Sequence, residues 1–506
     1  MSLQKQPSKH SDSKRILLLN LPAEGQCADF YTPRYAIDSF SVYPPLGLLY
    51  VATAIKDSYP VKIMDTVALN YTIAQTVEAV FNEAPAVLGI SCQTFRLFPM
   101  IEIIRKIKSR LPDITVVIGG PHTSIYPVET LQLPGVDYVI VGDGEAPFKK
   151  LLDVILGREK TDLKNIPGLV YKENGIVFQN ERDYHTSIDG IKIPDRSLLD
   201  CRYYYTAADE KEQVVTMISS RGCPFQCIFC DVQEKNYRWR SAQSVVDEME
   251  YIAKSFDNPV IHIFDDTFNL IEQRVFEICR EIERRDLKVK WTTRARVHPF
   301  GEEMVAAMKR AGLKRAHFGV ESGSEITLQN IKKGVTREQT VKAFELCRKY
   351  QIDSLAYFII GFDWETKKDI NATVAFTKEI GADYIMANTL YPAAKTVIYE
   401  GLLKSGKIQK DFWKEFASAP IKDFSLPQYR NKKTLSYLKR KLDETYLTFY
   451  LSPDFVLGNL NGKGRKERFS PSRFLFKAKL AFLIIGSYCE SCCREWLCRQ
   501  GINEIQ

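Results

Sequence analysis

Three closely spaced cysteines are the residues of this chain best suited to metal chemistry. Cys223, Cys227 and Cys230 form a C-x3-C-x2-C pattern with no fourth cysteine close behind. Thiolates are the preferred ligands of iron–sulfur clusters. Three thiolates on one short loop can bind three irons of a four-iron cluster and leave the fourth iron open. An open coordination position distinguishes a catalytic metal site from a closed structural one.

A zinc site or a disulfide framework fits the surroundings of these cysteines less well. A zinc site needs four ligands at suitable spacing, and the next cysteine, Cys279, falls on a predicted helix. A disulfide framework is not expected, because the cysteines are irregularly scattered and no secretory signal is seen. An apolar run at 214–218 predicts a strand before the loop, and 241–252 predicts an amphipathic helix after it. The loop is therefore expected at the end of a strand.

Length and charge indicate two or three domains with a basic end. The chain has 506 residues and a net charge of +8, and the segment from Gly401 onward has 20 Lys and Arg against 10 Asp and Glu. That excess suits an acidic substrate, an anionic membrane surface in peripheral contact, or simply a solvated face. Nucleic acid is not expected, because no recognition motif accompanies the charge. No apolar run is long enough to span a bilayer, and a reducing cytoplasm suits free thiols.

The N-terminal part, residues 14–156, is expected to form a doubly wound α/β domain after a disordered tail at 1–13. Apolar runs at 16–19, 61–64, 87–90, 115–118 and 138–141 predict parallel strands separated by helices. Ligands of such sheets bind at the carboxyl ends of the strands. Three adjacent ends are polar or rich in glycine, and no G-x-G-x-x-G fingerprint is present. The candidate ligand-binding residues at these ends are Ser91, Thr94, Gly119, Gly120, Gly142 and Glu145.

Residues 157–212 are expected to form a linker with a small hairpin, and residues 213–400 a partial (β/α)6 barrel. Six strand–helix units repeat across 213–400, beginning with the strand that leads into the cysteine loop. The other strand ends are polar or contain glycine, notably at 265–269, 319–324 and 361–366. Five such ends on one ring, with a metal loop on the sixth, argue for a shared site. Residues 401–506 are expected to be basic and mainly helical.

These motifs together resemble the radical S-adenosylmethionine (radical SAM) family, in the branch that has an N-terminal cobalamin-binding domain. The resemblance covers about residues 14–460, and the triple-cysteine loop is its most specific part. It implies a 4Fe-4S cluster bound by the three cysteines, with S-adenosylmethionine on the open iron. It also implies reductive cleavage to a 5′-deoxyadenosyl radical that removes a hydrogen atom from an unactivated carbon.

The resemblance also implies roles for individual residues around S-adenosylmethionine. Phe229 would lie beside the adenine, and Asp265 and Asp266 near the methionine amino group. Glu321 and Ser322 would address the ribose or the amino acid part, and Gly361 would permit close approach of the backbone. For Glu321, the alternative is a structural ion pair with a neighbouring arginine such as Arg294.

Cobalamin is the second cofactor that the resemblance implies. The strand end Ser91–Thr94, followed by Gly119 and Gly120, would embrace its nucleotide tail. The chain departs from the better known cobalamin pattern, because it has no Asp-x-His-x-x-Gly, and no histidine is assigned as a lower axial ligand. A second departure, at 391–396, replaces the usual Pro-Gly-Thr stretch and affects the expected pocket.

Four further cysteines, Cys489, Cys492, Cys493 and Cys498, allow either a zinc or auxiliary cluster site or a tail with free thiols; the second interpretation is favoured.

The leading function hypothesis is a cobalamin-dependent C-methyltransferase that acts on an unactivated carbon. The alternatives are a radical cyclase or oxidative enzyme of the tetrapyrrole-cyclase type and, from other classes, an RNA-modifying enzyme or a non-catalytic cobalamin sensor. The expected partners are a small-molecule or lipid-like substrate and an electron donor such as flavodoxin or ferredoxin.

Overall fold

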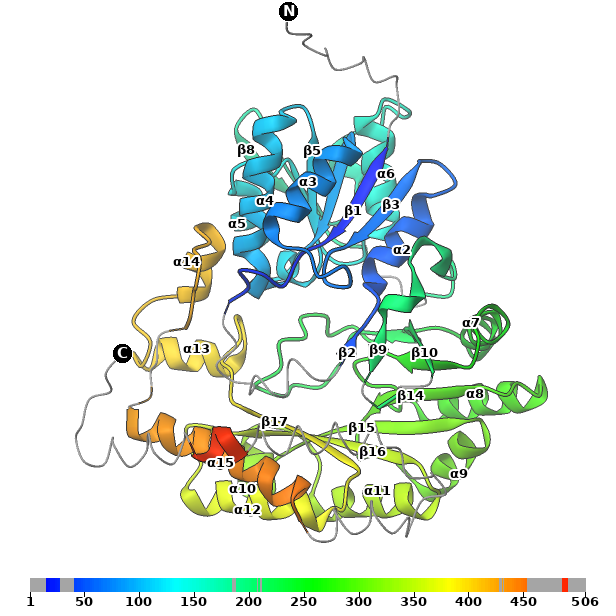
Figure 1. Cartoon of the computed structure of the whole chain (residues 1–506), viewed down its shortest axis with the longest axis vertical. Coiled ribbons are helices and arrows are strands. Elements are labelled where there is room, and N and C mark those ends of the chain that lie inside the picture. The colour runs from blue at the N-terminus through cyan, green and yellow to red at the C-terminus, as the bar shows by residue number, and fades with distance from the viewer. Residues whose placement is uncertain are drawn as a thin grey trace, which may run out of the picture.

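The computed structural model describes residues 15–27, 41–183, 188–206, 208–209, 212–426, 430, 432–452 and 485–489. An upper sheet with its helices stands over a lower sheet with its own helices (Figure 1). The N-terminal tail expected at 1–13 lies outside the described residues, as do Cys492, Cys493 and Cys498. Cys489 is exposed in a short helical stretch at 485–489. None of the described helices has both the length and the apolar composition needed to cross a bilayer.

The upper sheet is the doubly wound sheet that the alternating apolar runs predict. Its parallel strands are β1 (Ile16–Asn20), β3 (Val61–Asp65), β4 (Val87–Ser91), β5 (Thr115–Gly119) and β6 (Tyr138–Ile140), in the order β3-β1-β4-β5-β6. Helices α2 (Leu46–Ile55) and α6 (Glu145–Ile155) bury apolar side chains against one face. Helices α3 (Ile73–Glu83), α4 (Leu97–Arg110) and α5 (Pro127–Gln132) cover the other face. Both faces are covered, which explains why these strands are almost continuously apolar.

The hairpin expected in a linker belongs to this sheet. Strands β7 (Leu169–Glu173) and β8 (Ile176–Gln179) extend it beyond β6, and Val139 of β6 pairs with Val170 in antiparallel register. Leu169, Val170 and Tyr171 are buried in the same two cores as the parallel strands. The N-terminal sheet therefore has seven strands and continues past residue 156.

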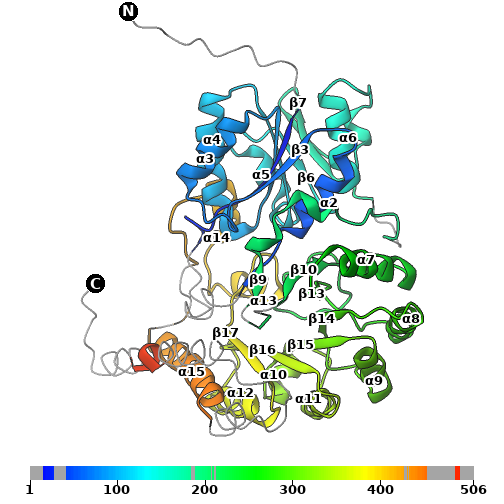
Figure 2. The ribbon, with the colours of Figure 1, turned by 45° about the vertical axis from the view of Figure 1, so that its right-hand side comes forward.

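The lower sheet is a half-barrel of six parallel strands in sequence order. The strands are β10 (Gln213–Met217), β13 (Pro259–Ile263), β14 (Lys290–Ala295), β15 (Leu313–Glu321), β16 (Asp353–Ile360) and β17 (Tyr384–Thr389). The helices that follow them are α7 (Ala242–Ser255), α8 (Glu272–Arg284), α9 (Glu302–Arg310), α10 (Glu325–Asn330), α11 (Arg337–Lys349) and α12 (Lys367–Glu379). These helices lie outside the sheet, so the inner face turns toward the N-terminal domain (Figure 2).

The segment after the half-barrel divides between the two domains. Helices α13 (Val397–Lys404) and α14 (Phe412–Ser418) place Tyr399 and Trp413 in one core with Tyr126 of the N-terminal domain. The Tyr399 hydroxyl donates to Asp411 over 3.0 Å, and Tyr126 reaches the same carboxylate. The chain thus returns to the N-terminal domain before it ends.

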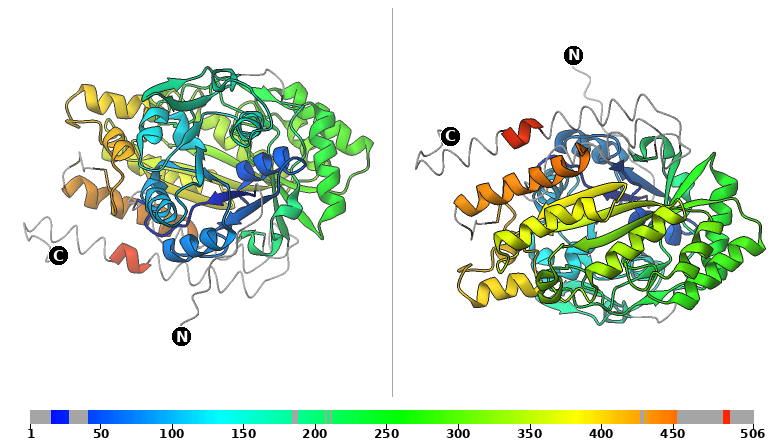
Figure 3. Two further views of the ribbon diagram at one scale, coloured as in Figure 1. Left: turned by 90° about the horizontal axis from the view of Figure 1, so that it is seen from above. Right: turned by 90° about the horizontal axis from the view of Figure 1, so that it is seen from below.

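Helix α15 (Lys432–Tyr450) packs against the half-barrel along its last strand, β17 (Figure 3). The Tyr446 hydroxyl accepts from the Ala387 N–H over 2.9 Å and donates to the Ala387 carbonyl over 3.0 Å. Tyr450 contacts the N–H and carbonyl of Ile385 in the same way. An edge strand leaves such backbone groups without a neighbouring strand. The two phenols supply the missing partners.

Candidate functional site

The cysteine loop follows β10 and is held between the two short strands β11 (Ser220–Arg221) and β12 (Arg238–Trp239). Gly222, just before Cys223, has a φ of +84°, and a Cβ there would lie 2.4 Å from the carbonyl oxygen of Asn236. Both facts require glycine at this position. The Cys223 N–H then donates to the Glu234 carbonyl over 3.0 Å, which fixes the start of the loop.

All three thiols of the loop are free and half-buried. The Cys223 sulfur lies 3.7 Å from the Thr267 hydroxyl, and burial raises the pKa of Cys230 to about 11. In the described part of the chain, no three His, Cys, Asp or Glu side chains converge on a point where they could bind a single metal ion. A four-iron cluster differs, because each cysteine ligates its own iron. The donor set, three free thiols on one rigid loop, fits such a cluster.

Asp265 supports this loop from behind. Its buried carboxylate accepts the backbone N–H groups of Ser219 (2.6 Å) and Ser220 (3.0 Å), and both serine hydroxyls (2.5 and 2.6 Å). The amino-group contact predicted for Asp265 remains a prediction, but these four bonds already occupy both oxygens. The structure places Asp265 as a positioning residue for the turn into the loop.

Asp266 and Phe229 stand on the open side of the same region. The Asp266 side chain is exposed. Partial desolvation by the surrounding protein raises its pKa, and the negative charge of Asp265 raises it further. Phe229 is half-buried, and its ring lies 6.1 Å from that of Phe362, which follows β16. An exposed carboxylate and a half-buried ring are available to a ligand; the cofactor contacts predicted for both remain predictions.

Glu321, at the end of β15, forms a buried ion pair, as the alternative interpretation expects, but its partner is a lysine and not an arginine. Its Oε1 lies 2.7 Å from the Nζ of Lys333, and not beside Arg294. A Cβ at Gly319 would lie 2.4 Å from that carboxylate oxygen, so glycine makes room for the pair. Glu321 itself has a φ of +66° at an irregularity in the β15–β16 pairing, which turns it off the strand.

Ser322 and Gly361 occupy the next positions around the ring. The Ser322 hydroxyl is fully buried and lies 2.9 Å from that of Thr373, so it orders the turn after β15. Gly361 has a φ of +92°, and its N–H donates to the Glu365 carboxylate over 2.7 Å. Burial raises the pKa of Glu365 to about 7. The cofactor contacts predicted for Ser322 and Gly361 remain predictions.

The N-terminal strand ends form a shallow row of small residues. Ser91, Thr94, Gly119 and Gly120 are partly exposed there, and a Cβ at Gly119 would meet nothing closer than 4.0 Å. Gly120 has a local reason for being glycine, since a Cβ there would lie 2.8 Å from the backbone nitrogen of Cys92. Gly119 thus leaves open space for a flat ligand. These residues fit a cobalamin cradle.

His122 is a residue of this region that sequence reasoning did not select. It is fully buried, and its Nδ1 lies 3.0 Å from the Thr94 hydroxyl. Burial lowers its pKa to about 3, so the imidazole is neutral at physiological pH. Through this contact the buried His122 orders the Thr94 side chain.

The turn after β6 joins the two domains at the cysteine loop. Glu145, predicted as a cofactor ligand, contacts Arg221 at 2.5 Å, two residues before Cys223. Asp143 pairs with Arg221 at 2.8 Å and with Arg238 at 2.6 Å. Gly142 is exposed, with a φ of +89°. The carboxyl ends of both sheets therefore meet at this point. The only sequence feature that pointed to this contact between the domains was the position of Arg221, two residues before Cys223.

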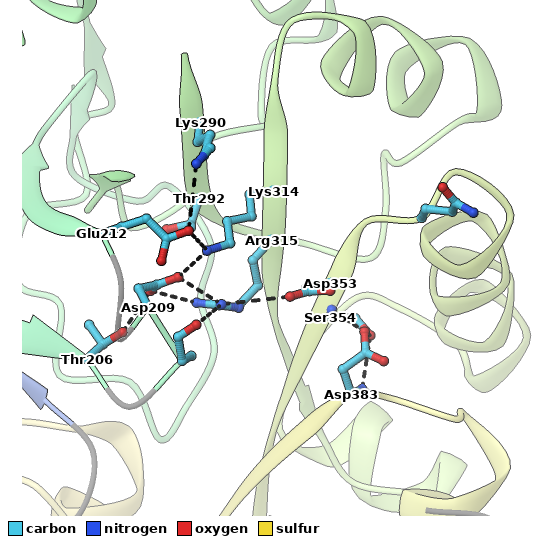
Figure 4. Close-up of polar contacts among 12 residues, drawn as sticks. Thr206, Asp209, Glu212, Lys290, Thr292, Lys314, Arg315, Asp353, Ser354 and Asp383 are labelled. Atoms are coloured by element: carbon cyan, nitrogen blue, oxygen red, sulfur yellow. Dashed lines mark hydrogen bonds and ion pairs between the residues drawn. The ribbon is translucent and has the colours of Figure 1, made fainter. Parts of the chain in front are cut away.

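A buried ionic network closes the floor of the half-barrel (Figure 4). Asp209, from the chain before β10, contacts Arg315 of β15 at 3.0 Å and Lys314 at 2.8 Å. Burial raises the pKa of Asp209, but the His262 and Arg315 contacts outweigh it, so the net pKa is well below the usual value. Arg315 lies 3.8 Å from Asp353 as well. The carboxylates neutralise the cations at the N-terminal ends of these strands. The part of the half-barrel that is open to a ligand therefore lies nearer the carboxyl ends.

Comparison with known proteins yields matches to two families and to named relatives. Residues 217–377 match the radical SAM superfamily, and residues 35–152 match the B12 binding domain. An uncharacterized methyltransferase of Pyrococcus horikoshii is 33% identical over 82% of this chain and 90% of its own length. The anaerobic magnesium-protoporphyrin IX monomethyl ester cyclase of Rubrivivax gelatinosus is 27% identical over 68% of this chain and 63% of its own length.

The fold is also similar to that of a solved structure. The radical S-adenosylmethionine methyltransferase TsrM of Kitasatospora setae, determined with cobalamin and a [4Fe-4S] cluster bound, superposes with a TM-score of 0.63. The match covers 78% of each chain at 20% sequence identity. The order of an upper doubly wound domain and a lower half-barrel is thus shared with that protein.

Proposed function

The chain belongs to the radical SAM superfamily, in the branch with a B12-binding domain, and from that premise we propose that it methylates an unactivated carbon of a small molecule. Its cofactors are a 4Fe-4S cluster, S-adenosylmethionine and cobalamin. When bound, they supply an electron, a hydrogen-abstracting radical and a methyl group. What the chain itself supplies is the placement of these groups.

We assign the cluster to Cys223, Cys227 and Cys230. Gly222 and Asp265 fix their loop, and the half-buried thiols limit access of water to the cluster. Asp266, Phe229 and the Gly361 turn stand on the side open to a ligand and are assigned to S-adenosylmethionine. Glu321 acts through its ion pair with Lys333, which holds the end of β15 in its turned conformation.

We assign cobalamin to the row formed by Ser91, Thr94, Gly119 and Gly120. Glu145 is assigned differently from its sequence-based prediction, because its carboxylate is paired with Arg221. Through this ion pair Glu145 joins the two domains. The positive φ of Gly142 permits the turn that places Glu145 beside Arg221.

One observation carries this proposal: the strand ends of both domains meet. The ion pairs of Asp143 and Glu145 with Arg221 and Arg238 hold the turn after β6 against the cysteine loop. Because cofactors bind at carboxyl ends of strands in both architectures, this contact makes both sites face one space. A methyl donor and a radical source would then reach the same substrate.

The test is anaerobic reconstitution followed by isotope transfer. Full-length protein with cluster and cobalamin is incubated with reductant, S-adenosylmethionine with a deuterated methyl group, and a small-molecule extract of the host. We expect a product with a trideuterated methyl group, with both 5′-deoxyadenosine and S-adenosylhomocysteine. The Cys227→Ala variant should bind less iron and give neither nucleoside, whereas Cys489→Ser, which changes an exposed thiol, should behave like the parent. Unlabelled product would refute methyl transfer.

The same assay separates the alternatives. A cyclase-type reaction would give 5′-deoxyadenosine without S-adenosylhomocysteine, and a cobalamin sensor would give neither. The 27% identity to the cyclase motivates the first comparison, but the more similar relative carries the name of a methyltransferase. RNA modification would place the label in RNA and not in small molecules.

Two further partners belong to the proposal. The reaction needs a one-electron donor of the flavodoxin or ferredoxin type, and the cytoplasm is the compartment that suits the free thiols. The substrate is a small or lipid-like molecule.

A further inference from the structure

The inner face of the half-barrel carries polar side chains in layers. Strand residues alternate between faces, and Trp291, Ala295, Ala316 and Phe318 are buried against the outer helices. Thr292 and Arg294 of β14, and Arg315 and His317 of β15, therefore face inward. Thr292 pairs with Arg315 in register, and Arg294 pairs with His317. Two residues along a strand span about 6.6 Å, so these pairs form two successive layers.

The lower layer is electrostatically complete. Arg315 is buried and paired with Asp209 (Figure 4). The Nδ1 of His262 lies 3.0 Å from the Thr292 hydroxyl. Lys314 and Lys290, nearer the floor, both have Glu212 as a partner, at 2.9 and 3.8 Å. Every cation at this depth thus has an acidic neighbour.

The upper layer differs in its cation. Arg294 is exposed, and throughout the described residues its guanidinium has neither a hydrogen bond nor an ion pair within 4.0 Å. Its charge lies over the ring of Phe264, 4.6 Å from the centroid. A guanidinium has five N–H donors in a planar fork that matches a carboxylate or a phosphate. The charge of Arg294 is one influence that lowers the pKa of Asp266, but no carboxylate of the described residues lies in ion-pair contact with it, so its fork is open to an anion.

The hydrogen-bonded pair of His317 and Tyr357 leaves one donor free beside Arg294. His317 places its Nδ1 3.1 Å from the Tyr357 hydroxyl, and its Nε2 has no hydrogen-bond partner in the described structure. Burial, followed by the charge of Arg315, lowers the pKa of His317 well below its usual value, so the ring is neutral. When Tyr357 donates to Nδ1, the proton of the imidazole is on Nε2, and a second unsatisfied donor stands beside the guanidinium.

An aromatic wall borders this layer. Tyr43, which follows β2 (Ser41–Val42), packs edge-on against Phe264 at 4.8 Å and against His262 at 5.4 Å between ring centroids. The upper layer thus combines a cationic fork with apolar surface, the composition of a site for a small molecule with one charged end.

We propose that Arg294, with His317 and Tyr357 beside it, binds a carboxylate or phosphate group of the substrate and places the apolar remainder along Phe264 and Tyr43. This inference rests on the proposed function, since it takes the half-barrel interior as the substrate site. It narrows the substrate class to anionic small molecules and names a specificity-determining residue.

The test uses the reconstituted full-length protein, with inorganic phosphate and acetate as probes. Binding of each probe is titrated calorimetrically in the presence of saturating S-adenosylmethionine. We expect saturable binding to the parent protein, the tighter probe indicating which anion the site prefers. The Arg294→Gln variant should weaken binding by about tenfold or more, because a charge-assisted pair is lost. Arg294→Lys should fall between the two, since it keeps the charge but not the fork.

A matched control and a second titration separate the loss of an anion site from a general change in surface charge or in cofactor binding. Arg280→Gln changes an exposed arginine on the outside of α8 and should leave probe affinity unchanged. The affinity for S-adenosylmethionine should stay within about twofold in Arg294→Gln, because a twofold change is well under 1.4 kcal/mol. A large loss of that affinity would assign Arg294 to the methionine carboxylate and overturn the proposal. Equal probe affinity in parent and Arg294→Gln, or no binding to either, would also overturn it. None of these outcomes depends on methyl transfer.

Discussion

The acidic residues at the strand ends differ in whether their carboxylates are open to a ligand or already bonded within the protein. Asp266 is exposed, whereas the carboxylates of Asp265 and Glu321 are already engaged by serines and by Lys333. The sequence alone cannot separate these cases, because all three are acidic residues at strand ends. Only the three-dimensional neighbours decide which carboxylate has a free oxygen.

Glu365 yields a prediction at this scale. Burial raises its pKa from 4.5 to about 7, so the folded protein holds a proton there that the unfolded chain has lost. The free energy of unfolding should therefore fall as the pH rises from about 4.5 to 7, and stay reduced above that range. Glu365→Gln, which has no charge to bury, should flatten this part of the profile. Urea midpoints at pH 5 and pH 8 measure the difference; an unchanged pH slope in the variant would contradict the assignment.

What the sequence predicts at residue scale follows from covalent and steric rules. The C-x3-C-x2-C loop and its glycine could be identified because their chemistry is local. Arg294 could not be assigned an inward direction until the register of β14 and β15 was known. The Glu145–Arg221 pair joins residues 76 positions apart and has no local signature.

At the scale of elements, apolar runs predicted all eleven parallel strands of the two sheets. The upper strands are apolar almost throughout, and the half-barrel strands carry apolar side chains on the face that packs against the outer helices. The hairpin β7–β8 was recognised as a hairpin but not as part of the upper sheet. Its turn signal is local, whereas its pairing with β6 depends on where the edge of that sheet lies.

The edge of the half-barrel supplies a prediction about α15. Tyr446→Phe and Tyr450→Phe each remove a hydroxyl that both accepts from and donates to the backbone of β17. Each substitution should cost about 1–3 kcal/mol, because a buried N–H is left without an acceptor. Denaturant unfolding measures this cost. Tyr205→Phe, at an exposed tyrosine, serves as the control and should change stability by less than about 0.5 kcal/mol. Equal stability of Tyr446→Phe and the control would show that water replaces the hydroxyl.

At the scale of the whole molecule, the two domains are held together by charges beside the cysteine loop. A double-mutant cycle with Glu145→Gln and Arg221→Gln should give a coupling energy above about 1 kcal/mol, since both side chains are mostly buried. The exposed pair Asp57–Lys192, at 2.7 Å, is the matched control and should give a clearly smaller coupling energy, because solvent screens it. Unfolding midpoints of the four variants in each cycle supply the numbers. Equal coupling energies for the two pairs would show that the Glu145–Arg221 ion pair is no stronger than a surface ion pair.

The return of the chain to the N-terminal domain after the half-barrel was the feature hardest to predict from the sequence. Residues from 401 onward were expected to form a separate C-terminal region, yet α13 and α14 share the apolar core of the N-terminal domain. Their amphipathic pattern predicts a buried face but not the surface that buries it.

That return has a consequence for how the protein can be divided. A fragment that stopped before the half-barrel would lose Tyr399, Trp413 and Phe416, and would expose the side chains around Tyr126 that they cover. The N-terminal domain is thus not a transplantable module, since part of its interior is encoded beyond the half-barrel. An exchange of the N-terminal domain with that of a relative would therefore have to include residues 397–418 as well.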